Sequence, residues 1–258
     1  MDKKILIIQF RNGYLEDNEQ HGFAAKLDVP KRELFFKNAF NKAAPYPETR
    51  DVQAIILGGS GDTHAGDENL PWYESLMAYI QKAIDNNIPV LEICFGHQLL
   101  GRLYGARIVC DPAQKELGTI AIRLNEEGQQ DALFKGATDP LYSIAGHNDS
   151  VVNLPPRLHV LASSDACPIQ AFKVNGHSVW GLQFHPELTE QDFKARVEYY
   201  KDHYVSKGDA FESIVQRGTI PTNDHVILKN FYAVAQRNEM PPALFTEKTN
   251  FVSSSRSA

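Results

Sequence analysis

The chain has 258 residues, 43% of them hydrophobic, which is enough to bury a substantial core. Its net charge of −6 provides no general attraction to nucleic acid, and no apolar run approaches the roughly 18 residues of a membrane span. Its three cysteines have no CxxC spacing, which argues against both a zinc site and a disulfide framework. We therefore expect a protein of the reducing cytoplasm, without nucleic acid or membrane as a partner.

The first half of the chain alternates apolar strands with helices. Strands are predicted at 4–9, 53–57 and 89–93, where apolar β-branched runs end in turn residues. Helical spacing of apolar residues predicts helices over 72–86 and 96–104. This alternation is typical of βαβ units in a mainly parallel sheet.

The segment from Arg11 to Pro47 is longer than a simple crossover between the first two strands needs. We predict a helix over Lys31–Asn41 and a loop over the site for the rest of the segment. Such a loop would shape a pocket wider than a small amide substrate requires.

The second half of the chain is richer in short strands. Asn175-Gly176 between two strand-like runs is a hairpin signal. The predicted strands lie at 119–124, 158–162, 169–174 and 178–182, and the predicted helices at 190–204, 210–216 and 224–237. Together these elements predict an α/β three-layer sandwich, flavodoxin-like, with a central, mostly parallel sheet, helices on both sides and a short antiparallel extension. We expect one domain over 1–237 and a flexible tail over 238–258.

Cys94 lies between the strand at 89–93 and the helix that follows, so its thiol is placed at a helix N-terminus. The unpaired N–H groups there favour the thiolate. A second apolar strand ends in His185-Pro186-Glu187. A histidine can accept the thiol proton, and a carboxylate can hold that histidine in one tautomer. The pattern predicts a Cys94–His185–Glu187 triad.

Two further features support a nucleophile at Cys94. Gly96, two residues later, suits the crowding of a nucleophile elbow. The glycine-rich strand end Gly58-Gly59-Ser60-Gly61 can bring the backbone N–H of Gly59 beside the thiol, where it would form an oxyanion hole with the N–H of Phe95. Cys110 and Cys167 are interpreted as core residues.

From about residue 52 to 190 the sequence resembles the class I, triad-type glutamine amidotransferases, and among them a stand-alone GMP-synthase-like domain. Five pieces carry the resemblance in order and spacing: Leu57-Gly58-Gly59-Ser60 with Pro71-Trp72, Ile93 to Gly101 around Cys94, His147-Asn148-Asp149-Ser150-Val151, Gln170-Ala171-Phe172, and Gln183 to Glu187. The resemblance implies hydrolysis of the glutamine side-chain amide through a γ-glutamyl thioester on Cys94, with release of ammonia. It implies no cofactor and no metal.

The resemblance also suggests how the substrate is held. Gln98 matches the glutamine that contacts substrate in the family, although a plain polar helix residue is the alternative. His147, Asn148 and Asp149 lie where the family holds the α-amino and carboxylate groups, and a structural role for His147 stays open. His97 is expected to pack or hydrogen-bond and not to catalyse.

One position departs from the family. The family usually has glycine two residues before the nucleophile, where this chain has Glu92. A carboxylate close to Cys94 would raise the pKa of the thiol by like-charge repulsion. A side chain that is turned away and hydrogen-bonded would leave the thiol unchanged.

Nothing in the sequence resembles a P-loop or ATP-grasp module, so the domain is expected to stand alone. It would then deliver ammonia to a separate synthase subunit. Alternatively, it would be a γ-glutamyl peptidase that acts on glutathione-like or other γ-glutamyl compounds. A third possibility, of another class, is a catalytically idle partner-binding or regulatory domain.

Overall fold

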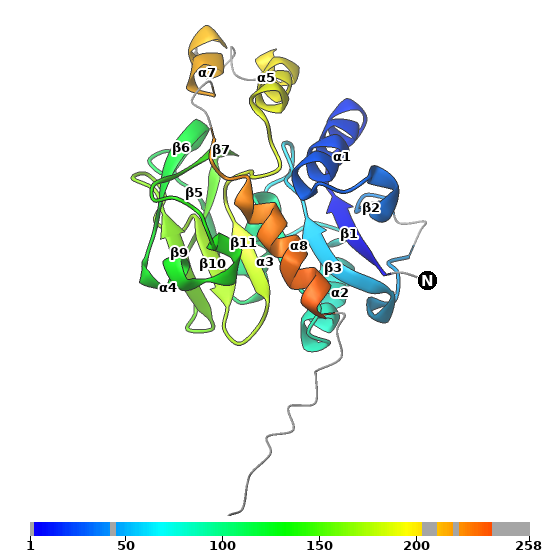
Figure 1. The fold of residues 1–258 in the computed structure, drawn as a ribbon. Coiled ribbons are helices and arrows are strands. Elements are labelled where there is room, and N and C mark those ends of the chain that lie inside the picture. The colour runs from blue at the N-terminus through cyan, green and yellow to red at the C-terminus, as the bar shows by residue number, and fades with distance from the viewer. Residues whose placement is uncertain (1–2, 42–44, 203–210, 219–221, 239–258) are drawn as a thin grey trace, which may run out of the picture.

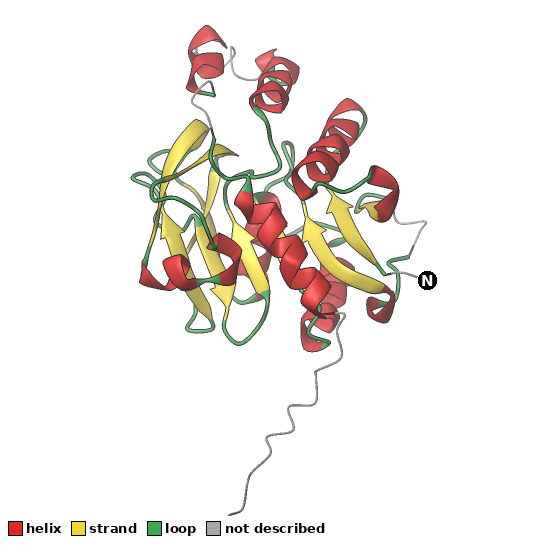
Figure 2. Ribbon diagram, viewed as in Figure 1, coloured by secondary structure: helices red, strands yellow, loops and turns green. Residues whose placement is uncertain are grey.

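A computed structural model describes residues 3–41, 45–202, 211–218 and 222–238. It confirms the α/β class: a curled nine-stranded sheet lies between helices (Figures 1 and 2). The predicted tail lies outside the described residues, except for Asn238. None of the helices in the described ranges combines the length and the apolarity that a membrane crossing requires.

The sheet has a parallel half and an antiparallel half, in the order β2-β1-β3-β4-β11-β10-β9-β6-β7. The parallel strands are β1 (Lys4–Gln9), β2 (Leu34–Asn38), β3 (Val52–Leu57), β4 (Val90–Ile93) and β11 (Val179–Leu182). The antiparallel strands are β6 (Glu116–Leu124), β7 (Leu141–His147), β9 (Leu158–Ser163) and β10 (Ala171–Val174). A separate two-stranded sheet pairs β5 (Arg107–Cys110) with β8 (Asp149–Val152). The antiparallel extension is therefore larger than the sequence predicts.

Helices cover both faces of the parallel half. The helices are α1 (Tyr14–Leu27), α2 (Tyr73–Asp85), α3 (Phe95–Leu103), α4 (Glu126–Gln130), α5 (Glu190–Tyr199), α7 (Phe211–Arg217) and α8 (Val226–Asn238), with 3-10 turns at Lys31–Glu33, Thr49–Asp51 and Ala132–Phe134. Figure 1 shows α8 crossing one face of the sheet, with α2 and α3 behind it. The alternation along β1 explains both layers, because Leu6 and Ile8 join one hydrophobic cluster and Ile5 and Ile7 the other.

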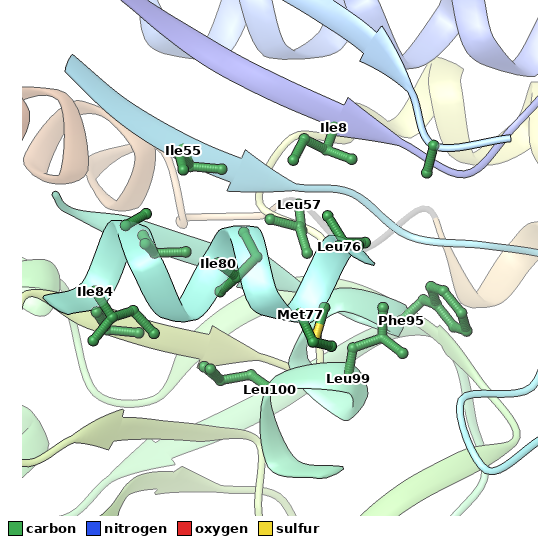
Figure 3. Close-up of a cluster of buried hydrophobic side chains, with 14 of the residues drawn as sticks. Ile8, Ile55, Leu57, Leu76, Met77, Ile80, Ile84, Phe95, Leu99 and Leu100 are labelled. Atoms are coloured by element: carbon green, nitrogen blue, oxygen red, sulfur yellow. The ribbon is translucent and has the colours of Figure 1, made fainter. Parts of the chain in front are cut away.

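The first cluster fixes the helix that follows Cys94. Leu99 and Leu100 of α3 and Ile80 of α2 pack over Ile55 and Leu57 of β3 (Figure 3). Burying an aliphatic side chain of this size contributes about 1.5–3 kcal/mol. The start of α3 is thereby held against the sheet, on the edge from which Cys94 emerges.

The segment from Arg11 to Pro47 is not the predicted loop and helix. Residues 14–27 form α1, and the predicted helix over Lys31–Asn41 is wrong, because the structure has a 3-10 turn followed by strand β2. Leu34, Phe35 and Phe36 are compatible with either state, and parallel pairing with β1 decides for the strand. Of the described residues in this segment, Arg11 alone lines the pocket beside Cys94, so the segment does not widen that pocket as predicted.

Strands β5, β7 and β8 are not predicted by hydrophobic patterning. The β7 run contains Ser143 and Gly146, which interrupt its apolar pattern, and it pairs with β6, the preceding strand in the chain. Cys110, at the end of β5, is exposed, so its interpretation as a core residue is wrong, whereas Cys167 is buried.

Candidate active site

Three loops meet at the carboxyl edge of the parallel strands. β4 lies between β3 and β11, and its Ile93 is paired with Leu182 of β11. Cys94 directly follows β4, the Gly58–Gly61 loop follows β3, and the segment with His185 and Glu187 follows β11. The site therefore forms where parallel α/β sheets place their ligands.

Cys94 has a strained backbone conformation between β4 and α3. Its φ of 51° and ψ of −99° fall outside the regions that non-glycine residues favour. A Cβ at Gly96 would lie 2.9 Å from the Leu57 Cβ and 3.1 Å from the Leu57 carbonyl oxygen. The structure thus explains why a residue without a side chain stands two places after the cysteine, as in a nucleophile elbow.

His185 and Glu187 form a buried pair. The His185 Nδ1 lies 2.7 Å from the Glu187 Oε1, and the two side chains are 4% and 0% exposed. A carboxylate only accepts hydrogen bonds, so Nδ1 carries the proton and Nε2 is left for the Cys94 thiol, with which His185 also hydrogen-bonds. The backbone N–H of His185 donates to the Ile144 carbonyl at 2.7 Å, which anchors this segment to β7.

Electrostatics favour the ionised forms of this cluster. Burial disfavours an imidazolium, but the charges of Glu187 and Cys94 outweigh it and raise the pKa of His185 to about 9. Burial likewise opposes ionisation of Glu187, yet His185 and Arg196 hold its pKa well below the usual range. The arrangement is suited to an imidazolium beside the Cys94 sulfur with an ionised carboxylate behind it.

The Gly59 backbone lies against the cysteine and the histidine. A Cβ at Gly59 would approach the His185 Cε1 and the Arg11 Nη2 to 2.9 Å each, and the Cys94 Cβ to 3.6 Å. No side chain fits there without displacing these groups. Phe95 begins α3, and its ring is buried against Phe10 with ring centroids 5.0 Å apart, while its backbone N–H in the first helical turn has no acceptor within the helix.

A pocket of about 350 Å³ opens onto these residues. Its lining includes the sequence-predicted residues Cys94, His185, Gln98, His147, Asn148 and Asp149. The Gln98 Nε2 donates to the Asp149 carbonyl at 2.9 Å, and the Asp149 carboxylate contacts the His64 Nδ1 at 2.9 Å. The predicted substrate-binding loop and the helix after Cys94 are therefore tied together.

Sequence reasoning missed a group of buried charged residues at the pocket, two of which, Arg11 and Arg196, belong to its lining. Arg196 of α5 lies 3.5 Å from the Glu187 Oε1 and 3.9 Å from the Glu19 Oε1, measured from its Nη2. The Arg11 Nε in turn lies 3.2 Å from the Glu19 Oε1, and all of these side chains are buried. Glu19 and Arg196 are far apart in sequence and belong to helices without a clear apolar stripe, so no local signal identifies them.

Glu92 lies away from the thiol and is not hydrogen-bonded. It shares the sheet face covered by α3, because a Cβ at Gly96 would be 3.2 Å from the Glu92 Cβ. The side chain is fully buried, and neither oxygen has a hydrogen-bond partner within the described residues. Burial raises its pKa well above the ordinary value, which favours the neutral acid over a charged carboxylate on this face of the sheet. The structure agrees with the expectation of a side chain turned away from the thiol, but without the hydrogen bond expected for it.

His97 belongs to the same buried face. Its ring packs on Phe172 with centroids 4.6 Å apart and covers Gly181, and burial lowers its pKa to about 3. It is a packing residue, as expected from the sequence, and not a second candidate base.

The buried Glu92 carries a prediction about stability. Above the ordinary pKa of 4.5, an exposed glutamate in the unfolded chain loses its proton while the folded Glu92 keeps it. The folded state then binds more protons, so stability falls as the pH rises, by at most about 1.4 kcal/mol per pH unit. Glu92→Gln cannot ionise, and we expect its stability relative to the wild type to increase between about pH 5 and about pH 8.

Urea unfolding at the two pH values measures this difference. Glu48→Gln, at an exposed carboxylate near Lys82, is the matched control and should show little change with pH relative to the wild type. A stability difference between Glu92→Gln and the wild type that is independent of pH would contradict the neutral-acid interpretation.

Comparisons with known proteins agree with this geometry. The model of the family "Glutamine amidotransferase class-I" matches residues 33–202. A glutamine-hydrolysing GMP synthase subunit from Methanococcus maripaludis is 33% identical over 168 residues, which cover 65% of this chain and 79% of that protein. The protein of the same description from Pyrococcus abyssi is 33% identical over 147 residues, covering 57% and 76%.

Solved structures share the fold. A glutamine amidotransferase from Thermotoga maritima superposes with a TM-score of 0.70 at 20% identity, over 92% of this chain and 98% of that one. A glutamine amido transferase from Methylobacillus flagellatus has a TM-score of 0.63 at 24% identity, over 92% and 91%. The family match over most of the chain and the identity to the GMP synthase subunits show that this chain belongs to the class I glutamine amidotransferase family.

Proposed function

We propose that this protein hydrolyses the side-chain amide of glutamine to glutamate and ammonia through a thioester on Cys94. The observation that carries the proposal is the Cys94 thiol at a strained strand-to-helix turn, hydrogen-bonded to a histidine that Glu187 holds, at the wall of an open pocket. Membership of the family supports the same chemistry.

In the acylation half, the Cys94 thiolate attacks the amide carbon of glutamine and forms the C–S bond. The negative charge that develops on the amide oxygen is stabilised by the backbone N–H groups of Gly59 and Phe95. His185, protonated by the thiol, transfers that proton to the leaving nitrogen. The C–N bond breaks, ammonia leaves, and the γ-glutamyl thioester remains.

In the deacylation half, water takes the place of ammonia. Neutral His185 removes a proton from the water, whose oxygen attacks the thioester carbon. The C–S bond breaks, and His185 returns the proton to sulfur, so that glutamine and water are converted to glutamate and ammonia. Glu187 stabilises the imidazolium in both halves and keeps its Nε2 directed at the reacting atoms.

The rest of the pocket provides groups for the amino acid part of glutamine. Asp149 offers a carboxylate for the α-amino group, and the adjacent Asn148 offers a donor for the α-carboxylate, while His147 positions this loop through its contact with the Asp149 carbonyl. Gln98 holds this loop through its bond to the Asp149 carbonyl and reaches the substrate side of the pocket. The reaction needs no cofactor.

A separate synthase subunit is the proposed acceptor of the ammonia. The curated relatives are described as glutamine-hydrolysing subunits of a GMP synthase, and this supports a division of labour in which another chain uses the ammonia. A reducing compartment such as the cytoplasm would keep the Cys94 thiol available.

The test is a hydrolysis panel on the pure protein with glutamine, glutathione and a γ-glutamyl dipeptide. We expect kcat/KM for glutamine to exceed that for the others by roughly tenfold or more, because a pocket fitted to a primary amide discriminates against a substituted one. Glutamate and ammonia should appear in equal amounts. A preference for glutathione or the dipeptide would reject the proposal in favour of a γ-glutamyl peptidase.

A second measurement detects the reactive cysteine even if the pure protein hydrolyses its substrate slowly without a partner subunit. Mass spectrometry after exposure to a glutamine-like electrophile should find one adduct per chain. Absence of both turnover and labelling in folded protein would instead favour the idle, partner-binding alternative.

A further inference from the structure

Three side chains of types that bind metal ions lie close together beside the pocket. The proposed hydrolysis does not use these three residues as a group. They are Glu116 at the start of β6, His147 at the end of β7 and Cys167 in the connection between β9 and β10. The antiparallel register pairs Glu116 directly with His147, which places both side chains on one face. Because the three residues come from separate segments, their spacing in the sequence does not reveal the group.

The ligand atoms are close enough to share one ion. The Glu116 carboxylate, a ring nitrogen of His147 and the Cys167 sulfur all lie within 4.8 Å of one another. Zn–N and Zn–O distances of about 2.0–2.2 Å and a Zn–S distance of about 2.3 Å separate ligand atoms in a tetrahedron by about 3.3–3.8 Å. Side-chain adjustments of about 1 Å therefore complete the geometry.

The orientation of His147 leaves a lone pair directed at a carboxylate. Its Nδ1 lies 3.1 Å from the Asp149 carbonyl oxygen, which only accepts, so Nδ1 carries a proton. Its Nε2 then faces the Glu116 Oε2 at 3.1 Å, with the two side chains 1% and 9% exposed. Two acceptors at this distance require a cation between them, either a proton or a metal ion. Histidine ligands of metals are typically held in this way by a backbone carbonyl.

The neighbours of Glu116 orient its carboxylate. The Ser164 hydroxyl donates to Oε1 at 2.7 Å, and the Gln170 Nε2 donates to Oε2. Ser164 also accepts from the Cys167 N–H at 3.0 Å, so one side chain fixes two of the three candidate ligands. Hydrogen bonds of this kind hold the ligand side chains in position before a metal ion binds.

We propose that Glu116, His147 and Cys167 bind one Zn²⁺, with the fourth coordination position directed to the pocket. Imidazole, carboxylate and thiolate together are a donor set typical of zinc, and three protein ligands leave one position open. Glu116 and His147 line the pocket, which provides the path of entry. Bound zinc would fix His147 and Glu116 at the substrate side of that pocket, and His147 is the first residue of the loop that we assign to glutamine.

The test must exclude a second thiol site, because Cys94 and His185 could also hold a metal. The double variant Cys94→Ala/Cys110→Ala leaves Cys167 as the single thiol of a chain that has three cysteines. We expect it to bind one Co²⁺ with a thiolate-to-cobalt charge-transfer band in the near ultraviolet, and Zn²⁺ should displace the cobalt. The triple variant that adds Cys167→Ser should lose the band and bind Zn²⁺ at least roughly 10- to 100-fold more weakly.

A second variant tests the site without changing any cysteine. Glu116→Gln in the double variant should weaken Zn²⁺ binding by a similar factor. Its matched control is Glu127→Gln, because Glu127 contacts the exposed His159 at the same distance of 3.1 Å. The control should leave the affinity unchanged. Absence of the charge-transfer band at one equivalent of Co²⁺, or equal Zn²⁺ affinity in the double variant and in Glu116→Gln, would overturn the proposal.

Discussion

Replacing Cys94 with alanine or serine is expected to lower kcat/KM for glutamine by about three orders of magnitude or more, because the members of a triad act as a unit. The residual rate would come from substrate positioning and the oxyanion hole alone. The fold should be retained, since Cys94 already has a positive φ that its surroundings impose and the new side chains are no larger. Steady-state kinetics and circular dichroism measure the two quantities.

Cys110→Ala is the matched control for the loss of a thiol. Cys110 is exposed at the end of β5 and lies outside the pocket lining, so its replacement should leave hydrolysis unchanged. A glutamine-like electrophile should modify Cys94 in the wild type. A stable adduct on Cys110 or Cys167, with Cys94 unmodified, would show that the nucleophile has been assigned to the wrong residue.

The centre of the fold was predictable because its strands are buried on both faces. Ile5 to Ile8, Ile55 to Leu57 and Val90 to Ile93 are almost purely apolar, which leaves little ambiguity between strand and surface segment. The helix after Cys94 was predictable for a related reason, since its apolar residues form one stripe that packs on β3.

The first crossover was not predictable from hydrophobic spacing. Helix α1 is mostly polar, and its buried face includes a glutamate and a glycine beside Leu15, Phe23 and Leu27, so it shows no continuous apolar stripe. Strand β2 lies at the edge of the sheet, where Phe35 is 44% exposed and the alternation is incomplete. Pairing with β1, a tertiary contact, determines its state.

The local sequence predicts only part of the candidate site. Cys94, His185 and Glu187 follow strands directly, so the order of strand and turn is enough to bring them to one edge. Arg11, Glu19 and Arg196 become neighbours only when α1 and α5 pack side by side behind Glu187. The interpretation of Glu92 assumed a charged carboxylate, whereas burial raises its pKa and favours the neutral acid.

The second large effect on activity is expected from replacing His185 or Glu187, the pair behind Cys94. His185→Ala should reduce kcat/KM nearly as much as the loss of Cys94, because no other base among the described residues hydrogen-bonds to the thiol. His159→Ala, at an exposed histidine of β9, is the control and should retain activity. Equal activity of His185→Ala and the wild type across the pH range would refute the assignment and would direct attention to His147, which also lines the pocket.

Glu187→Gln should be milder, by roughly one to two orders of magnitude, because the amide oxygen still accepts from Nδ1 while the charge is lost. The change also has a diagnostic pH dependence. Acylation requires an imidazolium to protonate the leaving nitrogen, so activity declines as the pH rises through the pKa of His185, which Glu187 helps to raise to about 9. Without that charge the pKa falls, and the alkaline limb of the kcat/KM profile should move to lower pH. A lower rate with an unmoved alkaline limb would mean that Glu187 acts only through packing.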